Sequence, residues 1–348
     1  MTAVFKIVCI ISIFLLAGCE SQPEENLAEE SLISVVYVNT LSGGGDIGYT
    51  DQIIEGLMRF NKLHKSSISL KNPIDMNEVT DIIQDWYVSS QKEDNKSLLV
   101  LGDYTYEQCL NNLNLELSDS HSIILVDTPF CENRQKGIHS FFISRFGISF
   151  LAGLMAGESE QASILAACRG VRSIDESVEG FSAGYREASG QDAHIYYLDS
   201  DYKGFSMPQK AFEWAKDLDC GFIFPLAGGS NNGVLRYTRQ FPLTTMLVAG
   251  MDVDCSGLST RVPFSVIIPI SEAVEAVLTD WYEDRLGEGD LTFHLGDELG
   301  AKIMVNKSFL SNAWIWEDYY DSPEYWSVQL EKYSEEARLM EKKYYGLL

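Results

Sequence analysis

The sequence predicts an α/β protein built from two doubly wound lobes. Short apolar, β-branched runs alternate with helical patterns from Leu32 onward, and such alternation is typical of parallel sheets covered by helices. Most of the runs lack polar alternation, as expected for strands that are buried on both faces. About nine such runs occur, whereas one sheet usually holds about four to six strands. Two sheets, and therefore two lobes, are expected.

The expected elements follow in order along the chain. The strands are Ile33–Val38, Ile68–Leu70, Leu98–Leu101, Ile123–Val126, Ile164–Ala167, Ile195–Leu198, Phe222–Phe224, Met246–Ala249 and Phe264–Ile268. The helices are Asp51–Leu63, Val79–Tyr87, Ile148–Ala156, Ser177–Glu187, Pro208–Leu218, Asn232–Phe241 and Ser271–Arg285. In the first helix, Ile53, Leu57 and Phe60 recur at the spacing of one helix face, which favours an amphipathic helix that packs on a sheet.

The N-terminus has the pattern of an export signal. Lys6 is the single charge among the first 19 residues. The apolar run Ile7–Leu16 is shorter than the roughly 20 residues that span a bilayer. Small residues precede Cys19, as before the cleavage site of a signal peptide. The segment resembles a bacterial lipobox, whose cysteine receives a diacylglycerol; the alternative is an ordinary signal peptide that contains a cysteine.

The domain organisation is predicted from composition. Residues 1–19 are expected to be the signal peptide. Residues 20–32 are polar and acidic without apolar periodicity, so they are expected to form a flexible tether. The rest is long enough for two lobes with separate cores. The expected ranges are 33–142 with 255–285 for an N-terminal α/β lobe, and 143–254 with 286–348 for a C-terminal α/β lobe.

The charge of the chain limits its partners. There are 26 basic and 51 acidic residues, and the formal net charge is −25. Nucleic acid phosphates repel such a protein, so nucleic acid is not an expected partner. The charge also disfavours direct binding to anionic lipid. Attachment to the bilayer is therefore expected through an acylated Cys19.

The cysteines do not predict a metal site. Five of them follow Cys19, and they are Cys109, Cys131, Cys168, Cys220 and Cys255. They form no C-x-x-C pair, whereas zinc sites need closely spaced ligands, so neither a metal nor another cofactor is expected. Exported proteins can form disulfides, and Cys109 and Cys131 each follow a predicted strand end. Buried free thiols are the alternative.

Two motifs known from enzymes occur in the wrong context. Gly43–Gly48 satisfies G-x-G-x-x-G, but the next strand ends in Lys71 and Asn72, where a dinucleotide site needs an acidic residue. Gly180–Gly184 satisfies G-x-S-x-G but falls inside a helical pattern, whereas a nucleophile elbow directly follows a strand. We expect a ligand-facing loop in the first case, close helix packing in the second, and no enzyme.

Polar and aromatic residues stand where the predicted strands end, which is where open α/β sheets bind ligands. They are Asp46–Asp51, Asp103, Tyr104, Asp127, Asp199–Phe205, Gly228–Gly233, Asp252 and Asp254. Carboxylates accept hydrogen bonds from hydroxyl groups, and aromatic faces stack on rings. The set predicts a cleft for a neutral, hydroxyl-rich ligand with a flat ring. For Asp51, Asn231 and Asn232 the alternative role is a helix cap.

Six segments form a set of motifs in a fixed order. They are Asp46–Asp51 with Gly56-Leu57, Phe150–Ala156, Glu179–Gly184, Gly204-Phe205, Ala227–Val234 and Gly250–Asp254. Together they resemble the basic membrane protein family of substrate-binding lipoproteins. These serve ABC importers and include purine nucleoside receptors. The corresponding motifs of that family are, in the same order, D-x-S-F-N-D…G-L, Y-L-A-G-x-x-A, F-x-x-G-F-x-A-G, G-S-F, A-G-x-x-G-x-G-V and I-G-V-D-x-D. The resemblance covers most of residues 33–268.

The resemblance implies a type I periplasmic-binding-protein fold, with two lobes that are joined by three crossovers and close on a ligand. It implies that Tyr49 and Phe205 stack on the base and that Thr50 stands where the family has an asparagine. It also implies that Asp252 and the Gly228 backbone hold ribose. Asp46 and Asp127 would line the same cleft, as further ligand-binding residues.

Two departures from the family concern base recognition. Thr50 has one hydroxyl where an amide offers separate donor and acceptor groups. The family's S-V-x-K reads Ser265–Ile268 here, so the cleft lysine is replaced by Ile268. The expected function is a lipid-anchored solute-binding protein of the cell envelope that delivers a nucleoside-like molecule to an ABC permease. The alternative is a ligand sensor or surface interaction protein on the same scaffold, without a transport role.

Overall fold

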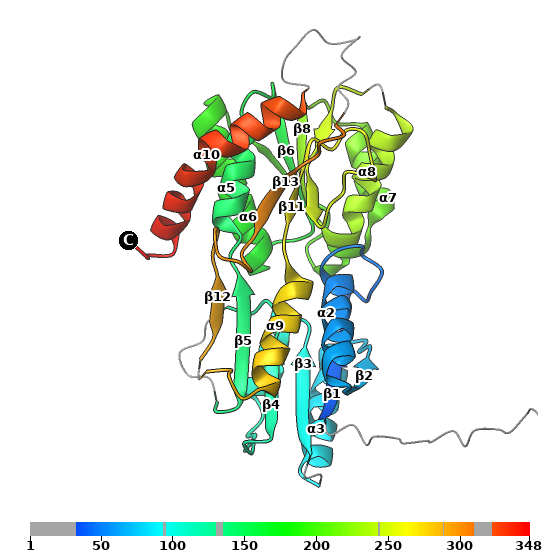
Figure 1. Cartoon of the computed structure of the whole chain (residues 1–348). Coiled ribbons are helices and arrows are strands. Elements are labelled where there is room, and N and C mark those ends of the chain that lie inside the picture. Colours follow the sequence, from blue (N-terminus) through cyan, green and yellow to red (C-terminus); the bar gives the residue numbers. More distant parts are fainter. Residues whose placement is uncertain (1–32, 93–94, 130–134, 243, 288, 310–321) are drawn as a thin grey trace, which may run out of the picture. The chain divides into compact units, whose positions relative to one another are not determined.

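The computed structural model describes residues 33–92, 95–129, 135–242, 244–287, 289–309 and 322–348 (Figure 1). The expected signal peptide, Cys19 and the tether lie outside the described residues, as does Cys131. Among the residues that are described, no helix is long and apolar enough to cross a membrane.

The first lobe is a six-stranded parallel sheet with its helices. Its strands, in sheet order, are β12 (Leu291–Phe293), β5 (Ile138–Ile143), β4 (His121–Leu125), β3 (Lys96–Leu101), β1 (Ile33–Val38) and β2 (Ser67–Lys71). Its helices are α2 (Tyr49–His64), α3 (Met76–Ser90), α4 (Glu107–Asn111) and α9 (Ile270–Tyr282). Helices α2 and α9 pack closely at Gly56. A Cβ on this residue would stand only 2.6 Å from the carbonyl oxygen of Ser271, so glycine permits the contact.

The second lobe is a four-stranded parallel sheet with its helices. The strands, in sheet order, are β7 (His194–Tyr197), β6 (Ala162–Ala166), β8 (Phe222–Leu226) and β9 (Leu247–Val248). The helices are α5 (Phe146–Met155), α6 (Arg172–Ser189), α7 (Pro208–Lys216) and α8 (Asn231–Gln240). Each β-to-α connection returns the chain to a parallel strand, which is the arrangement of a doubly wound α/β fold.

A small third sheet lies beside the crossovers. It joins β10 (Gly250–Asp252) in parallel to β11 (Phe264–Ile267), which pairs antiparallel with β13 (Lys302–Val305). The chain passes between the lobes three times, namely between β5 and α5, between β11 and α9, and between β12 and β13 (Figure 1). Strand β11, expected in the N-terminal lobe, pairs with β10 and β13, and β12, expected in the C-terminal lobe, pairs with β5. The structure differs from the expected lobe ranges at these two strands, and the other bounds stay a prediction.

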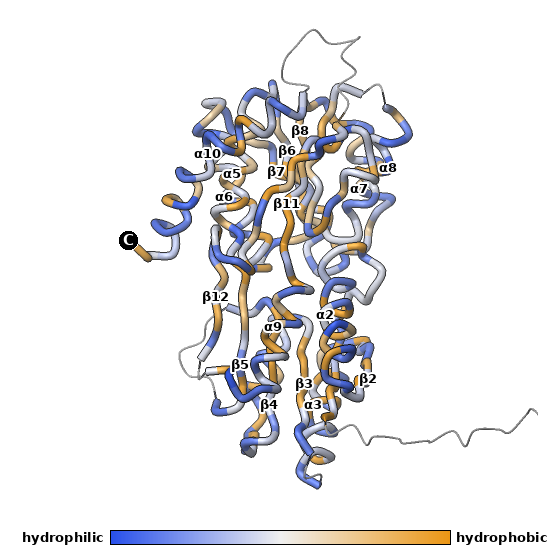
Figure 2. The backbone as a smooth tube through the Cα atoms, in the orientation of Figure 1, coloured by the Kyte–Doolittle hydropathy of each residue, from blue (hydrophilic) through white to orange (hydrophobic). Residues whose placement is uncertain are grey.

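The cores explain the continuous apolar runs of the sequence. Leu98, Leu99, Val100 and Leu101 of β3 have no exposed surface, so both faces of this strand are covered. Figure 2 shows apolar strands between helices whose outer turns are hydrophilic. The expected α/β class with two parallel sheets is confirmed by this arrangement.

Aromatic residues are concentrated between Trp314 and Trp326 near the C-terminus, and helix α10 (Pro323–Tyr344) carries the last two of them, Tyr325 and Trp326. Trp326 is completely buried, with its ring centroid 5.3 Å from that of Phe264 and 6.2 Å from that of Phe222. This ring therefore packs against the second lobe and the small sheet. Trp314, Trp316, Tyr319 and Tyr320 lie outside the described residues.

Candidate ligand-binding cavity

Residues at the carboxyl ends of the strands of both lobes line one cavity of about 360 Å³. This volume lies within the range of roughly 300–1,000 Å³ that is typical of small-molecule sites. All seven residues expected to bind a ligand line it, namely Asp46, Tyr49, Thr50, Asp127, Phe205, Gly228 and Asp252. The structure thus brings the whole expected set together, and its role in binding stays a prediction.

Asp46 organises the start of α2. Its carboxylate accepts hydrogen bonds from the backbone N–H groups of Gly48 at 2.9 Å, Thr50 at 3.0 Å and Asp51 at 3.3 Å. A carboxylate is favourable there, because the first N–H groups of a helix have no partner within it. The carboxylate of Asp51 in turn accepts from Gly45 N at 2.7 Å. The glycine-rich loop is thus closed by the chain's own carboxylates.

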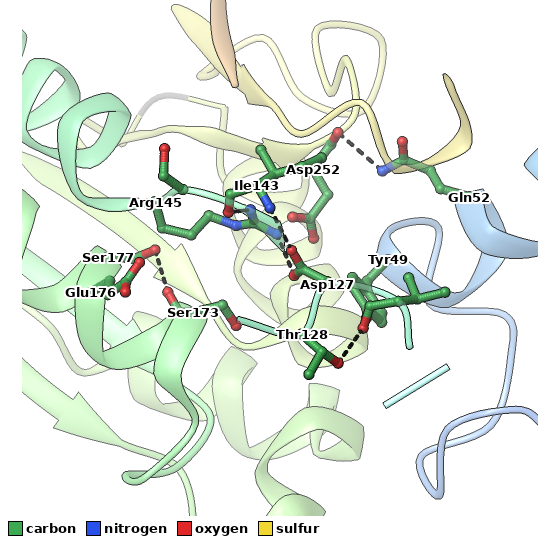
Figure 3. Close-up of polar contacts among 12 residues, drawn as sticks. Tyr49, Gln52, Asp127, Thr128, Ile143, Arg145, Ser173, Glu176, Ser177 and Asp252 are labelled. Carbon is green, nitrogen blue, oxygen red and sulfur yellow. Dashed lines mark hydrogen bonds and ion pairs between the residues drawn. The ribbon is translucent and has the colours of Figure 1, made fainter. Parts of the chain in front are cut away.

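Asp127 and Arg145 form a buried ion pair in the cavity wall (Figure 3). Arg145 Nη2 lies 2.7 Å from Asp127 Oδ2, and the two side chains are 7% and 4% exposed respectively. Asp127 also accepts from Ile143 N at 3.1 Å, and Arg145 donates to the carbonyl oxygen of Ile143. Burial raises the pKa of Asp127, and the charge of Arg145 opposes this rise.

Asp252, at the end of β10, faces the same ion pair (Figure 3). Its backbone oxygen accepts from Gln52 Nε2 at 3.2 Å, while its carboxylate has no hydrogen-bond donor among the described residues. Burial raises its pKa to about 7; Arg145 lowers the pKa, and Asp46 and Asp127 raise it. This carboxylate is therefore available to a ligand.

Two of the cavity carboxylates belong to residues with a positive φ. Asp127 has a φ of 48° and Asp252 a φ of 67°, in the left-handed region that side chains other than those of glycine, Asn and Asp rarely adopt. Such conformations persist where the surrounding structure fixes them, and they cluster at binding sites. Both residues line the cavity.

Aromatic rings from both lobes face the cavity. Tyr49 from α2 donates its hydroxyl to Gly102 O at 3.2 Å, and burial raises its pKa well above the usual value, so the hydroxyl stays neutral. Phe205 stacks on Tyr202 with ring centroids 6.1 Å apart. Gly228 has a φ of 50°, and a Cβ there would stand 3.0 Å from the Phe205 ring. Glycine at this position leaves room for the ring.

Tyr104 bridges the two lobes at the cavity. It follows β3 in the first lobe and donates its hydroxyl to Gly170 O of the second lobe at 2.7 Å. Tyr202 of the second lobe donates to the Tyr104 hydroxyl at 3.3 Å. Both tyrosines line the cavity, so these bonds link the lobes beside the space for a ligand.

The two positions that depart from the family differ in environment. Thr50 is 1% exposed, and its hydroxyl lies 3.3 Å from that of Thr40. Ile268 is also 1% exposed and packs in the apolar core. The cavity nevertheless has a cation, because Arg145 supplies one from a different strand end. This arginine is not among the ligand-binding residues that were expected from the sequence.

The G-x-S-x-G segment lies inside α6, and its glycines allow α6 to pack on α5. A Cβ on Gly180 would stand 2.3 Å from Phe146 O, and one on Gly184 would stand 2.1 Å from Phe150 O. The expected close helix packing is confirmed.

The described cysteines are buried free thiols, namely Cys109, Cys168, Cys220 and Cys255. Within the described part of the chain, no group of His, Cys, Asp or Glu side chains is arranged to hold a metal ion. Cys131 is not among the described residues, so its pairing stays a prediction.

Comparison with protein-family models and with curated proteins gives no match in sequence. Solved structures do match. An ABC transporter solute-binding protein from Aeropyrum pernix K1 is 17% identical, with a TM-score of 0.68 over 90% of this chain and 92% of that chain. A transcriptional activator of the comK gene from Bacillus halodurans is 15% identical, with a TM-score of 0.60 over 87% and 97%.

A third match is a periplasmic binding protein/LacI transcriptional regulator from Alkaliphilus metalliredigens QYMF in complex with D-xylulofuranose. It is 12% identical, with a TM-score of 0.60 over 81% of this chain and 100% of that chain. Identities this low establish a shared fold only. Together with the two lobes and three crossovers, they show that the chain has a type I periplasmic-binding-protein fold.

Proposed function

We propose that this protein is a lipid-anchored solute-binding protein that encloses a nucleoside-like molecule and delivers it to an ABC permease. The observation that carries the proposal is a cavity to which both lobes contribute side chains, among them the rings of Tyr49 and Phe205 and the carboxylates of Asp127 and Asp252. No covalent chemistry is required, because a ligand that contacts both lobes shifts the population toward the closed state.

The proposed ligand follows from the chemistry of the lining. Tyr49 and Phe205 offer ring faces for a base. The carboxylate of Asp252 accepts from ribose hydroxyls, and Arg145 has further N–H groups for an acceptor on the base. Four aspartates and one arginine line the cavity, so an anionic ligand such as a nucleotide is disfavoured.

The proposed location rests on the N-terminal sequence. The predicted export signal ends at Cys19. An acyl chain on this residue would hold the domain at the outer face of a membrane, with residues 20–32 as the tether. Metabolic labelling with a palmitate analogue tests this step. We expect label on the native protein and none on a Cys19→Ala variant.

The ligand is tested by thermal unfolding and calorimetry of the mature chain with nucleosides, bases and sugars. A ligand at 100 times its Kd stabilises by about 2.7 kcal/mol. Asp252→Asn should weaken binding about ten- to a hundredfold, as expected for the loss of a charged hydrogen bond. Asp254→Asn is the matched control, because this nearby carboxylate is exposed and does not line the cavity. If no nucleoside binds, the nucleoside assignment is wrong.

A second candidate function is ligand sensing without transport. It is favoured by the fold's occurrence in a transcriptional activator and in a LacI-type regulator. Uptake of the identified ligand by cells with and without the protein separates the two functions. Uptake that is unchanged in cells without the protein supports sensing, and consumption of the ligand by the purified protein would indicate an enzyme instead.

A further inference from the structure

Glu341 of α10 carries a buried carboxylate and does not line the cavity. It is 1% exposed. Its Oε1 accepts from Ser144 Oγ at 2.6 Å and from Leu295 N at 2.6 Å, and its Oε2 accepts from Gly147 N at 2.9 Å. An unpaired buried carboxylate is unfavourable, so these hydrogen bonds are what permits a charge at this position.

The three donors belong to two different crossovers between the lobes. Ser144 and Gly147 lie between β5 and the first turn of α5, and Leu295 follows β12 on the way to β13. The two crossovers also contact each other directly, because Ser144 N donates to Phe293 O at 3.0 Å. Glu341 therefore joins the first and third crossovers from outside both.

The geometry at Gly147 is specific for this contact. A Cβ there would stand 2.2 Å from Glu341 Oε2, so a residue with a side chain would displace the carboxylate. Gly147 is the second residue of α5, and the positive end of a helix dipole stabilises an anion. The ring of His294 also lies beside this carboxylate, with its Nδ1 3.3 Å from Glu341 Oε1.

The end of α10 is also fixed to the second lobe. The ring of Tyr344 stacks on Phe146 with centroids 4.0 Å apart. Tyr344 donates to Glu179 Oε2 at 3.0 Å, and Tyr345 donates to Glu176 Oε2 at 2.5 Å. The end of α10 that carries Glu341 is thus held by α6 as well as by the crossovers.

We propose that α10 acts as a strap across the hinge, in which Glu341 holds the first and third crossovers together and limits how far the lobes open. Hinge motion requires backbone rotations in the connecting segments, and a side chain bonded to both segments resists such rotations. The inference does not depend on the identity of the ligand.

Hydrogen–deuterium exchange of the ligand-free mature chain tests the strap. In Glu341→Gln, at least one N–H or O–H donor faces the new amide nitrogen and loses its acceptor. Exchange at residues 144–147 and 293–296 should rise about tenfold, the factor that corresponds to one charged hydrogen bond. Exchange around Gly170, where Tyr104 bridges the lobes, should rise as well because the lobes open more often. Glu331→Gln on the exposed face of α10 is the matched control and should leave all rates unchanged.

A rise in exchange that is confined to α10 would overturn the proposal, because Glu341 would then support only this helix. An equal rise in exchange in β3 and at the crossovers would also overturn it, because Glu341 would then contribute only to global stability. Should Glu341→Gln fail to fold, Ser144→Ala removes the 2.6 Å hydrogen bond to Glu341 together with a 3.2 Å contact from the same hydroxyl to Phe293 O. The readout is then the exchange of Gly147 N and Leu295 N, which donate to Glu341 itself. Faster exchange at both of these amides supports the strap, and rates equal to those of the native protein overturn it.

Discussion

Replacing Arg145 by methionine is expected to destabilise the protein strongly. The substitution keeps an apolar stem but removes the cation 2.7 Å from Asp127, whose side chain is only 4% exposed. Asp127 then keeps one hydrogen bond, from Ile143 N, and a buried charge without a partner. Breaking a buried pair in this way costs about 3–5 kcal/mol. Urea unfolding at pH 7 measures the loss.

A double-mutant cycle isolates the pair. Asp127→Asn combined with Arg145→Met leaves neither charge, so it should restore most of the stability lost in Arg145→Met alone.

The stability lost in Arg145→Met should also depend on pH. Arg145 lowers the pKa of Asp127, whereas burial raises it, so without Arg145 the folded-state pKa lies further above the unfolded value of about 3.9. An acidic group whose pKa is raised in the folded state destabilises the fold at pH values above its unfolded pKa. The stability lost in Arg145→Met should therefore become smaller as the pH falls from 7 toward 5.

The control is Arg239→Met, because Arg239 is exposed on α8 and surface substitutions usually change stability by less than about 0.5 kcal/mol. The reasoning is refuted if Arg145→Met loses less than about 1 kcal/mol at pH 7, or if the double variant is no more stable than this single variant.

Two further predictions concern the cavity and the helix packing. The pKa of Asp252 is raised to about 7, so its burial destabilises the ligand-free protein increasingly as the pH rises from about 4 through 7. Asp252→Asn should therefore raise Tm more at pH 8 than at pH 5, and equal gains would contradict the shift. Gly184→Ala places a Cβ 2.1 Å from Phe150 O and should lower the free energy of unfolding by about 1–3 kcal/mol. Gly257→Ala, with no atom within 4 Å, should change it little, and similar urea midpoints for the two variants would refute the packing argument.

The fold was largely predictable because its strands are buried on both faces. β3 and β4 appear in the sequence as uninterrupted apolar runs, and the helix expected over Ser177–Glu187 lies within α6. Strand β5 was not predicted, since His139 and Ser140 interrupt its apolar run. Strands β12 and β13, with three and four residues, are too short to give a periodic signal.

The candidate site was predicted where a strand end was recognised. Asp127 and Asp252 each follow a predicted strand, and the rule that ligands bind at the carboxyl ends of strands brings them together. Arg145 was missed because β5 was missed. The available signal was a lone arginine between two apolar runs, Phe141-Phe142 and Phe146–Phe150. No sequence pattern could show that Asp46 is occupied by the N–H groups of α2, because capping and ligand binding use the same residue type.

The place of β12 in the first sheet has a consequence for how the protein matures. This strand, at residues 291–293, pairs with β5 and completes a sheet that begins at Ile33. During synthesis, the first lobe thus stays unfinished until most of the chain has been made, and its last strand pairs with a strand 150 positions earlier, Leu291 with Phe141. Pairings this distant form slowly and leave strand edges exposed meanwhile. Fragments that stop before residue 291 should therefore aggregate rather than yield an independently folded lobe.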